Sequence, residues 1–253
     1  MDDAPAVAIR GLAKRYGHTV AVDHIDLDIA RGSFFGVVGP NGAGKTTTIL
    51  MCTGLLRPDA GAVWLLGLDV WADPRRAKER IGVLPEGLRL FERLTGAELL
   101  AYTGELRSMP QDVVRQRSAE LLAVMDLASA GDTLVIDYSA GMRKKIGLAA
   151  ALLHAPRLLF LDEPFESIDP ISARAIRNVL VSFTESGGTV VFSSHVMELV
   201  ERLCDHVAVL HKGRVVAVGG VDELRAGRRL EEVFIDVVGA GNLDAKGLSW
   251  LGS

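Results

Sequence analysis

A glycine-rich loop that follows an apolar run constrains the fold of this chain more than any other feature. The loop consists of Gly39, Pro40, Asn41, Gly42, Ala43, Gly44, Lys45 and Thr46, and it continues into Thr47. It matches the phosphate-loop pattern G-x-x-x-x-G-K-S/T, and the apolar run 34–38 directly before it is typical of a buried strand. The sequence therefore predicts a strand, a phosphate-binding loop and a helix, in that order, and a bound nucleoside triphosphate.

The residue types in this loop suit a triphosphate. Glycines let successive backbone N–H groups point at phosphate oxygens, and the helix that opens near Lys45 adds the positive end of its dipole. We expect Lys45 to reach the β- and γ-phosphates and the Thr46 hydroxyl to hold Mg²⁺. Without the strand before it and the helix after it, the same pattern would describe an ordinary glycine-rich turn.

A second apolar run, 158–161, ends in two acidic residues, Asp162 and Glu163. A short continuous apolar run is typical of a strand that is buried on both faces of a parallel sheet. Alternation along such a strand would send the two carboxylates to opposite sides. We expect Asp162 to hold Mg²⁺ and Glu163 to polarise a water for attack on the γ-phosphate. The alternative is a strand end with two solvated acids.

Three further motifs follow in the segments 138–142 and 167–170 and at His195. Together with the features above, they resemble the ATPase subunit of an ABC (ATP-binding cassette) transporter, over residues 5–235. Segment 138–142, YSAGM, is similar to the signature loop of the family, and segment 167–170, SIDP, is similar to its D-loop. The resemblance implies ATP and Mg²⁺ as cofactors and ATP hydrolysis as the activity. Five motifs in the family's order are more specific than any one of them.

The resemblance also implies roles for single residues. Tyr16 stands where family members stack an aromatic ring on adenine, and His195 where they place a histidine that contacts the γ-phosphate. The nucleotide contacts expected from the signature loop and the D-loop belong to Ser139, Ala140, Gly141 and Asp169. Each residue also has a plainer interpretation: Tyr16 as a half-exposed aromatic in a turn, His195 as a histidine at a strand end, and Ser139 as the cap of an apolar helix over 146–153.

The sequence departs from the family pattern at two positions. Glu86 occupies the place of the usual Q-loop glutamine, where its carboxylate would keep an oxygen for Mg²⁺ and add a negative charge near the γ-phosphate. Ala140 replaces the first signature glycine. If that position needs a positive φ, alanine would be strained there, whereas in a helical backbone the methyl group costs little.

Composition excludes several other kinds of protein. The 253 residues are 49% hydrophobic, enough for one large α/β core, and the net charge of −4 argues against bulk nucleic-acid binding. No apolar stretch long enough to span a bilayer occurs, and the N-terminus lacks the features of a signal peptide, so we expect a polypeptide on the cytoplasmic side of the membrane. Cys52 and Cys204 are too few for a disulfide framework and lie in apolar contexts typical of buried thiols.

The pattern along the chain predicts an α/β fold with a P-loop NTPase core. Apolar runs such as 190–192 and 207–210 add strands to a mainly parallel sheet, and 7–9 and 25–29 fit a small antiparallel sheet near the N-terminus. Between about 90 and 154 the pattern becomes helical, which predicts an inserted α-helical subdomain within an ATP-binding domain that spans 5–235. Residues 236–253 form a C-terminal tail, which follows a short segment, 230–234, that suits a terminal helix.

The resemblance implies two kinds of partner. In the family, the phosphate loop of one subunit and the signature of another enclose each ATP, so we expect a homodimer; a heterodimer with a second ATPase chain is the alternative. A separate integral membrane permease would be the other partner and would contact segment 88–91, unless those apolar residues belong to the subdomain core. Segment 230–234, after 213–216, resembles the C-terminal segment of ATPases from multidrug, antibiotic or polysaccharide exporters, so we expect export of a drug-like, lipid or polysaccharide substrate. A regulatory module with little turnover and a soluble ABC ATPase remain alternative functions.

Overall fold

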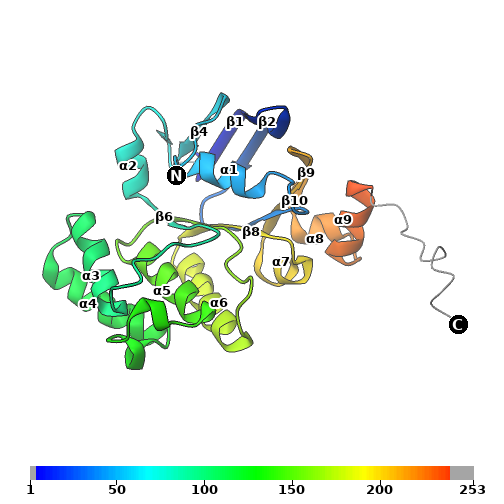
Figure 1. Ribbon diagram of the computed structural model, residues 1–253. Coiled ribbons are helices and arrows are strands. Elements are labelled where there is room, and N and C mark those ends of the chain that lie inside the picture. The colour runs from blue at the N-terminus through cyan, green and yellow to red at the C-terminus, as the bar shows by residue number, and fades with distance from the viewer. Residues whose placement is uncertain (1–3, 240–253) are drawn as a thin grey trace, which may run out of the picture.

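The computed structural model describes residues 4–239, which form two β-sheets with helices around them (Figure 1). The ends of the chain, 1–3 and 240–253, lie outside the described residues, so most of the predicted tail 236–253 is not covered. None of the helices in residues 4–239 is both long enough and apolar enough to cross a bilayer. Cys52 and Cys204 are buried free thiols, as expected.

The smaller sheet is antiparallel and has the order β2-β1-β4-β5. Its strands are β1 (Val7–Tyr16), β2 (Thr19–Ile29), β4 (Ala60–Leu65) and β5 (Leu68–Asp69). Along β2, the buried Ile25, Leu27 and Ile29 alternate with the exposed Asp26 and Asp28, as a strand with one solvated face requires. This confirms the antiparallel N-terminal subdomain predicted from the alternation.

The larger sheet has six strands in the order β10-β9-β3-β8-β7-β6. Its strands are β3 (Phe34–Val38), β6 (Ile81–Leu84), β7 (Leu158–Leu161), β8 (Thr189–Ser194), β9 (His206–His211) and β10 (Arg214–Gly220). All neighbouring strands pair in parallel except β9 and β10, which form an antiparallel hairpin. The mainly parallel sheet is therefore confirmed, and β3, β7 and β8 are buried along their whole length.

Each face of the larger sheet contributes to its own apolar core. Leu158 and Phe160 of β7 join the core that contains α1 (Lys45–Cys52) and the antiparallel sheet. Leu159 and Leu161 point the other way, into the core shared with the helices. Burial on both faces explains why the strand is a continuous apolar run with no alternation.

The predicted helical insert lies on this second core, away from the antiparallel sheet (Figure 1). It comprises α3 (Gly96–Leu106), α4 (Gln111–Val124), two short 3₁₀ turns, η1 (Ala128–Ala130) and η2 (Val135–Asp137), and α5 (Ala140–Leu152). Thr95 and Glu98 form a capping box that fixes the start of α3, because each satisfies a backbone N–H of the other. The insert is therefore attached through a well-defined first turn.

The remaining helices are α2 (Pro74–Glu79), α6 (Pro170–Glu185), α7 (Met197–Leu203), α8 (Val221–Arg225) and α9 (Leu230–Val238). Helix α9 buries Leu230 and Val233 and contacts α7, while Phe234 packs partly buried on the same core. The expected terminal helix is thus present. It runs on to Val238, across the predicted domain boundary at residue 235.

Candidate functional site

The loops that follow β3, β6, β7 and β8 meet at one edge of the larger sheet. These strands are parallel, so their carboxyl ends lie at the same edge, where ligands bind in open α/β sheets. The loops carry Lys45, Glu86, Glu163 and His195, and all four side chains line one cavity of about 480 Å³. Residues far apart in the sequence are therefore brought together by the order of the strands.

The phosphate loop supplies a large part of the wall of this cavity. Gly42 and Gly44 have φ values of 78° and 105°, a conformation that favours glycine, and Gly44 caps the start of α1. The lining of the cavity includes the loop residues Asn41, Gly42, Ala43, Gly44, Lys45, Thr46 and Thr47. The loop and the first turn of α1 thus form the expected arrangement for an anion at a helix N-terminus.

The Lys45 ammonium group is buried, with only 6% of the residue exposed. Its Nζ donates to the carbonyl oxygen of Gly39 at 2.8 Å and to that of Pro40 at 3.4 Å. It also lies 3.6 Å from Oε1 of Glu163, which is itself 7% exposed. A buried cation held by neutral carbonyls and one carboxylate can engage a phosphate oxygen with little solvent in competition.

The turn after β7 sets the directions of Asp162 and Glu163. The strand ends at Leu161, and Glu163 has a φ of 46°, in the left-handed region. The prediction that alternation within a strand directs these two side chains is therefore wrong, because neither residue belongs to the strand. The Glu163 N–H donates to Ser193 Oγ at 2.9 Å, and the Ser193 hydroxyl donates to Oδ1 of Asp162 at 2.5 Å.

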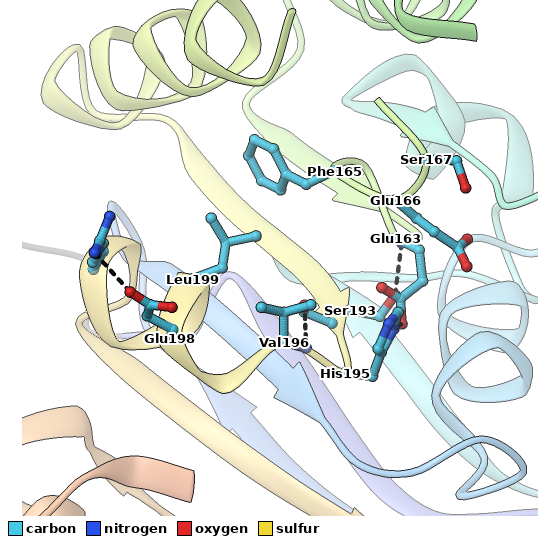
Figure 2. A pocket seen from close by; sticks show the side chains of 11 residues that line it. Glu163, Phe165, Glu166, Ser167, Ser193, His195, Val196, Glu198 and Leu199 are labelled. Carbon is cyan, nitrogen blue, oxygen red and sulfur yellow. Dashed lines mark hydrogen bonds and ion pairs between the residues drawn. The ribbon is translucent and has the colours of Figure 1, made fainter. Parts of the chain in front are cut away.

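His195 completes the surroundings of the Glu163 carboxylate. Its Nδ1 lies 3.1 Å from Oε1 of Glu163, the same oxygen that faces Lys45. Figure 2 shows Glu163, Ser193 and His195 close together beside a second cavity, of about 410 Å³, between the turn after β7 and the start of α7. The carboxylate is thus held from two sides while it lines both cavities.

Three oxygen-bearing side chains meet at the start of α1. Thr46 Oγ1 donates to Oε2 of Glu86 at 3.1 Å, and the Asp162 carboxylate, which accepts from the Ser193 hydroxyl, lies near the same threonine. Burial raises the pKa of Asp162, and the nearby Glu86 and Glu163 carboxylates raise it further. A divalent cation would offset this accumulation of negative charge.

These side chains fit Mg²⁺. Magnesium in nucleotide sites is bound by one or two carboxylates, a hydroxyl, waters and phosphate oxygens, and seldom by a full protein cage. No cluster of three or more His, Cys, Asp or Glu that could hold a metal by itself occurs between residues 4 and 239. The donor set of Thr46, Glu86 and Asp162 is of the partial kind that a nucleotide-bound magnesium needs.

Tyr16 lines the same cavity at the end of β1, and half of its surface is exposed. An exposed aromatic face next to a phosphate loop is available for stacking on a base. The structure therefore brings the expected adenine contact to the expected cavity. This leaves both interpretations of Tyr16 in place, since a half-exposed ring is also what a plain turn residue would show.

The signature segment does not line this cavity. Ser139 is the N-cap of α5 and accepts a hydrogen bond from the Met142 N–H, so the helix begins well before the apolar run 146–153. Ala140 is the first helical residue and has no positive φ, which settles the question of strain: the methyl group is compatible with the backbone. Gly141 packs against the start of α6, where an added Cβ would lie 2.5 Å from Ser172 Oγ.

Asp169 likewise lies outside the cavity. It caps α6 by accepting hydrogen bonds from the Ile171 and Ser172 N–H groups, each at 2.9 Å. Its hydrogen bonds to Ser172 lower the pKa of this carboxyl. Ser139, Ala140, Gly141 and Asp169 are therefore gathered at the facing ends of α5 and α6, separate from the phosphate loop of the same chain.

Segment 88–91 combines buried and exposed apolar side chains. Leu88 and Leu90 pack, partly buried, against the helical core. Phe91 is 56% exposed and makes an edge-to-face contact with Tyr102, with 5.1 Å between the ring centroids. The leucines therefore belong to the subdomain core, the Phe91–Tyr102 pair faces outward, and the contact with a permease stays a prediction.

Sequence reasoning missed Ser193, whose hydroxyl links the Asp162 carboxylate to the Glu163 backbone. The position of Ser193 next to Asp162 can be predicted once the strand order is known. Leu161, the last residue of β7, pairs with Phe192 of β8, so the residues that follow them, Asp162 and Ser193, begin side by side. The strand order itself is not visible in the sequence.

Comparison with known proteins gives a consistent result. A family profile described as ABC transporter matches residues 22–166. The daunorubicin resistance ATP-binding protein DrrA3 of Streptomyces coeruleorubidus is 39% identical over 240 residues, covering 95% of this chain and 76% of that protein. The linearmycin resistance ATP-binding protein LnrL of Bacillus subtilis (strain 168) is 36% identical over 213 residues, covering 84% of this chain and 68% of that protein. A solved ATP binding subunit of an ABC transporter matches 92% of this chain and 99% of its own, with a TM-score of 0.85 and 28% sequence identity.

Proposed function

The chain belongs to the ABC transporter family, and from this premise we propose that it is the ATP-hydrolysing subunit of an exporter. The observation that carries the proposal is the position of the Glu163 carboxylate. It lies 3.6 Å from Lys45 Nζ and 3.1 Å from His195 Nδ1, and it lines the cavity formed by the phosphate loop. A carboxylate held by two side chains beside a triphosphate site can orient and deprotonate an attacking water.

In this proposal the phosphates lie on the loop 39–47 and engage Lys45, and adenine stacks on Tyr16. Thr46, Glu86 and Asp162 would hold Mg²⁺, which when bound neutralises part of the phosphate charge. Glu163 accepts the proton of the attacking water, and His195 orients Glu163 and contacts the γ-phosphate. Ser139, Ala140, Gly141 and Asp169 would contact the nucleotide that is bound to the phosphate loop of a second subunit, since these residues lie outside the chain's own cavity.

Two partners follow from the same proposal. A second copy of the chain would place its signature segment over the phosphate loop of the first, and a separate membrane permease would be driven by closure of this dimer on ATP. The protein would then act as a peripheral subunit at the cytoplasmic side of the membrane. The names of two relatives refer to resistance against daunorubicin and linearmycin, and among the drug-like, lipid and polysaccharide alternatives they support export of a drug-like substrate.

The alternative of a regulatory module with little turnover rested on Glu86 and Ala140. The helical backbone at Ala140 removes one of these two grounds. Glu86 contributes a carboxylate next to Thr46 and does not fill the cavity, so it is compatible with turnover. We therefore retain hydrolysis as the proposed activity.

Replacing Glu163 by Gln tests the activity. The variant keeps the shape of the side chain and a hydrogen-bonding oxygen but cannot accept the proton, so ATP turnover should fall by about 10²- to 10⁴-fold. Binding of a fluorescent ATP analogue should stay within about threefold of the wild type, because the phosphate loop is unchanged. Glu185→Gln, at the exposed end of α6, is the matched control and should retain turnover. Wild-type turnover in Glu163→Gln would refute the assignment.

A further inference from the structure

Lys144 of α5 reaches out of the helical insert to the backbone of Glu163. Its Nζ donates to the Glu163 carbonyl oxygen at 2.6 Å, across nineteen positions of sequence. Helix α5 is the helix that Ser139 caps, so this contact joins the signature segment to the turn after β7. The contact runs directly from Lys144 to Glu163, with no other residue of the turn between them.

The backbone of Glu163 needs external support. Its φ of 46° is unfavourable for a residue with a Cβ, and such conformations persist only where neighbouring groups hold them. Both backbone polar groups of the residue are bonded: the N–H donates to Ser193 Oγ from β8, and the C=O accepts from Lys144 Nζ from α5 and, within the turn, from the Glu166 N–H at 3.2 Å. The side chain of Glu163 is therefore aimed by a turn that is fixed from two sides.

The position of the Lys144 ammonium group also has an electrostatic consequence. The carboxylates of Glu166, Glu163, Asp162 and Glu86 all lie near enough to favour its charged form. Burial acts in the opposite direction and lowers the pKa of this lysine. A cation among four acidic groups weakens their mutual repulsion and so makes it less costly to keep Glu163 close to Asp162.

The start of α5 is tightly seated near this contact. Gly141 and Lys144 are three residues apart, which places them on the same face of the helix. At Gly141 an added Cβ would lie 2.5 Å from Ser172 Oγ and 2.8 Å from Asp169 Oδ2, so α5 approaches the start of α6 as closely as its backbone allows. A displacement of the signature segment would therefore be passed directly to Lys144 and, through it, to Glu163.

We propose that Lys144 is a positioning residue for hydrolysis, which fixes the turn that aims the Glu163 carboxylate and couples that turn to the signature helix. The inference rests on the proposed role of Glu163 as the group that activates water. It assigns to Lys144 a backbone contact and no contact with the nucleotide. Loss of the lysine should accordingly slow the chemical step and leave ATP binding in place.

The test compares Lys144→Met with Lys145→Met. Lys145 is the next residue of the same helix, it is more deeply buried, and its Nζ donates to the Asp126 carbonyl at 3.3 Å, away from Glu163. In Lys144→Met, kcat for ATP should fall by about ten- to a hundredfold, as expected for loss of a charged hydrogen bond at the site. KM and the affinity for a fluorescent ATP analogue should change by less than about threefold. Lys145→Met should not show this combination of a lower kcat and an unchanged KM.

Two further measurements keep the test independent of folding defects. Lys144→Arg, which retains charge and N–H donors, should recover most of the lost kcat. Hydrogen–deuterium exchange in peptides that cover 162–168 should be faster in Lys144→Met than in Lys145→Met, because the turn loses its hydrogen bond to α5. Unchanged exchange in this segment, or equal kcat values for the Arg and Met variants, would overturn the inference.

The outcomes separate this inference from the proposed function. If Glu163→Gln is inactive and Lys144→Met retains wild-type kcat, the inference is wrong and the proposed function stands. If Lys144→Met and Lys145→Met lose ATP binding and turnover to the same extent, the lysine has only a general structural role and the inference is again wrong. Wild-type turnover in Glu163→Gln would overturn both.

Discussion

Glu86 is the residue whose chemistry most distinguishes this site, because a charge stands where the family usually has a neutral amide. Its Oε2 accepts a hydrogen bond from the Thr46 hydroxyl at 3.1 Å, and the Asp162 carboxylate lies near the same threonine. Two carboxylates thus approach the position at which we propose Mg²⁺. A second negative charge strengthens the attraction for a divalent cation and opposes the triphosphate.

Replacing Glu86 by Gln should therefore change the dependence of hydrolysis on magnesium. We expect the Mg²⁺ concentration for half-maximal turnover to rise by about three- to tenfold, because one anionic ligand becomes neutral. Binding of an ATP analogue without metal should not weaken, since Tyr16 and the phosphate loop are intact and one charge that repels the triphosphate is gone. A magnesium titration of the variant that superimposes on that of the wild type would place Glu86 outside the coordination shell.

At the scale of elements, two adjacent small residues at the start of α5 differ in the space that surrounds them. Ala140 is the first residue of the helix and tolerates a methyl group, whereas Gly141 faces Asp169 and Ser172 at distances that leave no room for one. The sequence alone presents both as positions of the signature loop. Only the packing of α5 on α6 shows that, of these two positions, Gly141 is the one at which a methyl group does not fit.

Gly141→Ala should therefore destabilise the fold by about 1–3 kcal/mol, the range for inserting a methyl group into a filled space. Ala140→Gly should cost no more than about 1 kcal/mol, from backbone entropy alone. Urea unfolding of the two variants beside the wild type measures the difference. If Gly141→Ala is as stable as the wild type, α5 and α6 can move apart at this point without loss of stability.

The end of α5 provides a pH-sensitive contact. His154 Nε2 lies 2.9 Å from the carbonyl oxygen of Ile81 in β6, so the ring proton belongs on Nε2, and the buried Nδ1 has no partner among the described residues. Burial lowers the pKa of His154 to about 4, and the nearby Arg107 acts in the same direction. The folded protein thus prefers the neutral ring.

The sign of the pH effect follows from this preference. Between its ordinary pKa of 6.5 and about 4, the unfolded chain binds a proton that the folded chain does not, so stability falls as the pH is lowered through this window. Solvent screening reduces the effect to about 1–2 kcal/mol between pH 7 and pH 4.5. His154→Gln should lose that dependence in urea unfolding at a series of pH values. If the free energy of unfolding depends on pH in the same way in the variant and in the wild type, the proposed role of His154 is wrong.

Elements with a local cause could be predicted, whereas directions set by distant contacts could not. The apolar runs of β3 and β7, the alternation in β2 and the capping box at Thr95 act within a few residues, and the structure contains each of them. The end of β7 does not have a local cause. The left-handed turn at Glu163 is held by Ser193 and Lys144, which lie thirty residues after it and nineteen before it.

At the scale of the whole molecule, the phosphate loop and the signature segment do not line the same cavity. Lys45 lies in the phosphate-loop cavity, whereas Ser139 caps α5 outside it. The motifs predicted this division only through the family resemblance, because spacing in the sequence cannot show which copy a signature serves. Two copies, each presenting its Ser139 to the other's phosphate loop, would complete two equivalent sites.

Mixing two inactive variants tests the central claim, which is ATP hydrolysis in sites shared between two copies of this chain. Lys45→Ala removes the charge for the phosphates, and Ser139→Arg places bulk and a fixed cation against the partner's nucleotide, so each variant alone should be inactive. In a mixed dimer both lesions fall in one site and the other site is intact.

The decisive measurement is ATPase activity after the two variants are unfolded and refolded together, or co-expressed. Random pairing should restore about a quarter of the wild-type rate, provided that one intact site turns over alone. Each variant treated in the same way by itself controls for the procedure. Activity that stays at the level of the separate variants would contradict shared sites in a homodimer and would assign the signature facing Lys45 to a different chain.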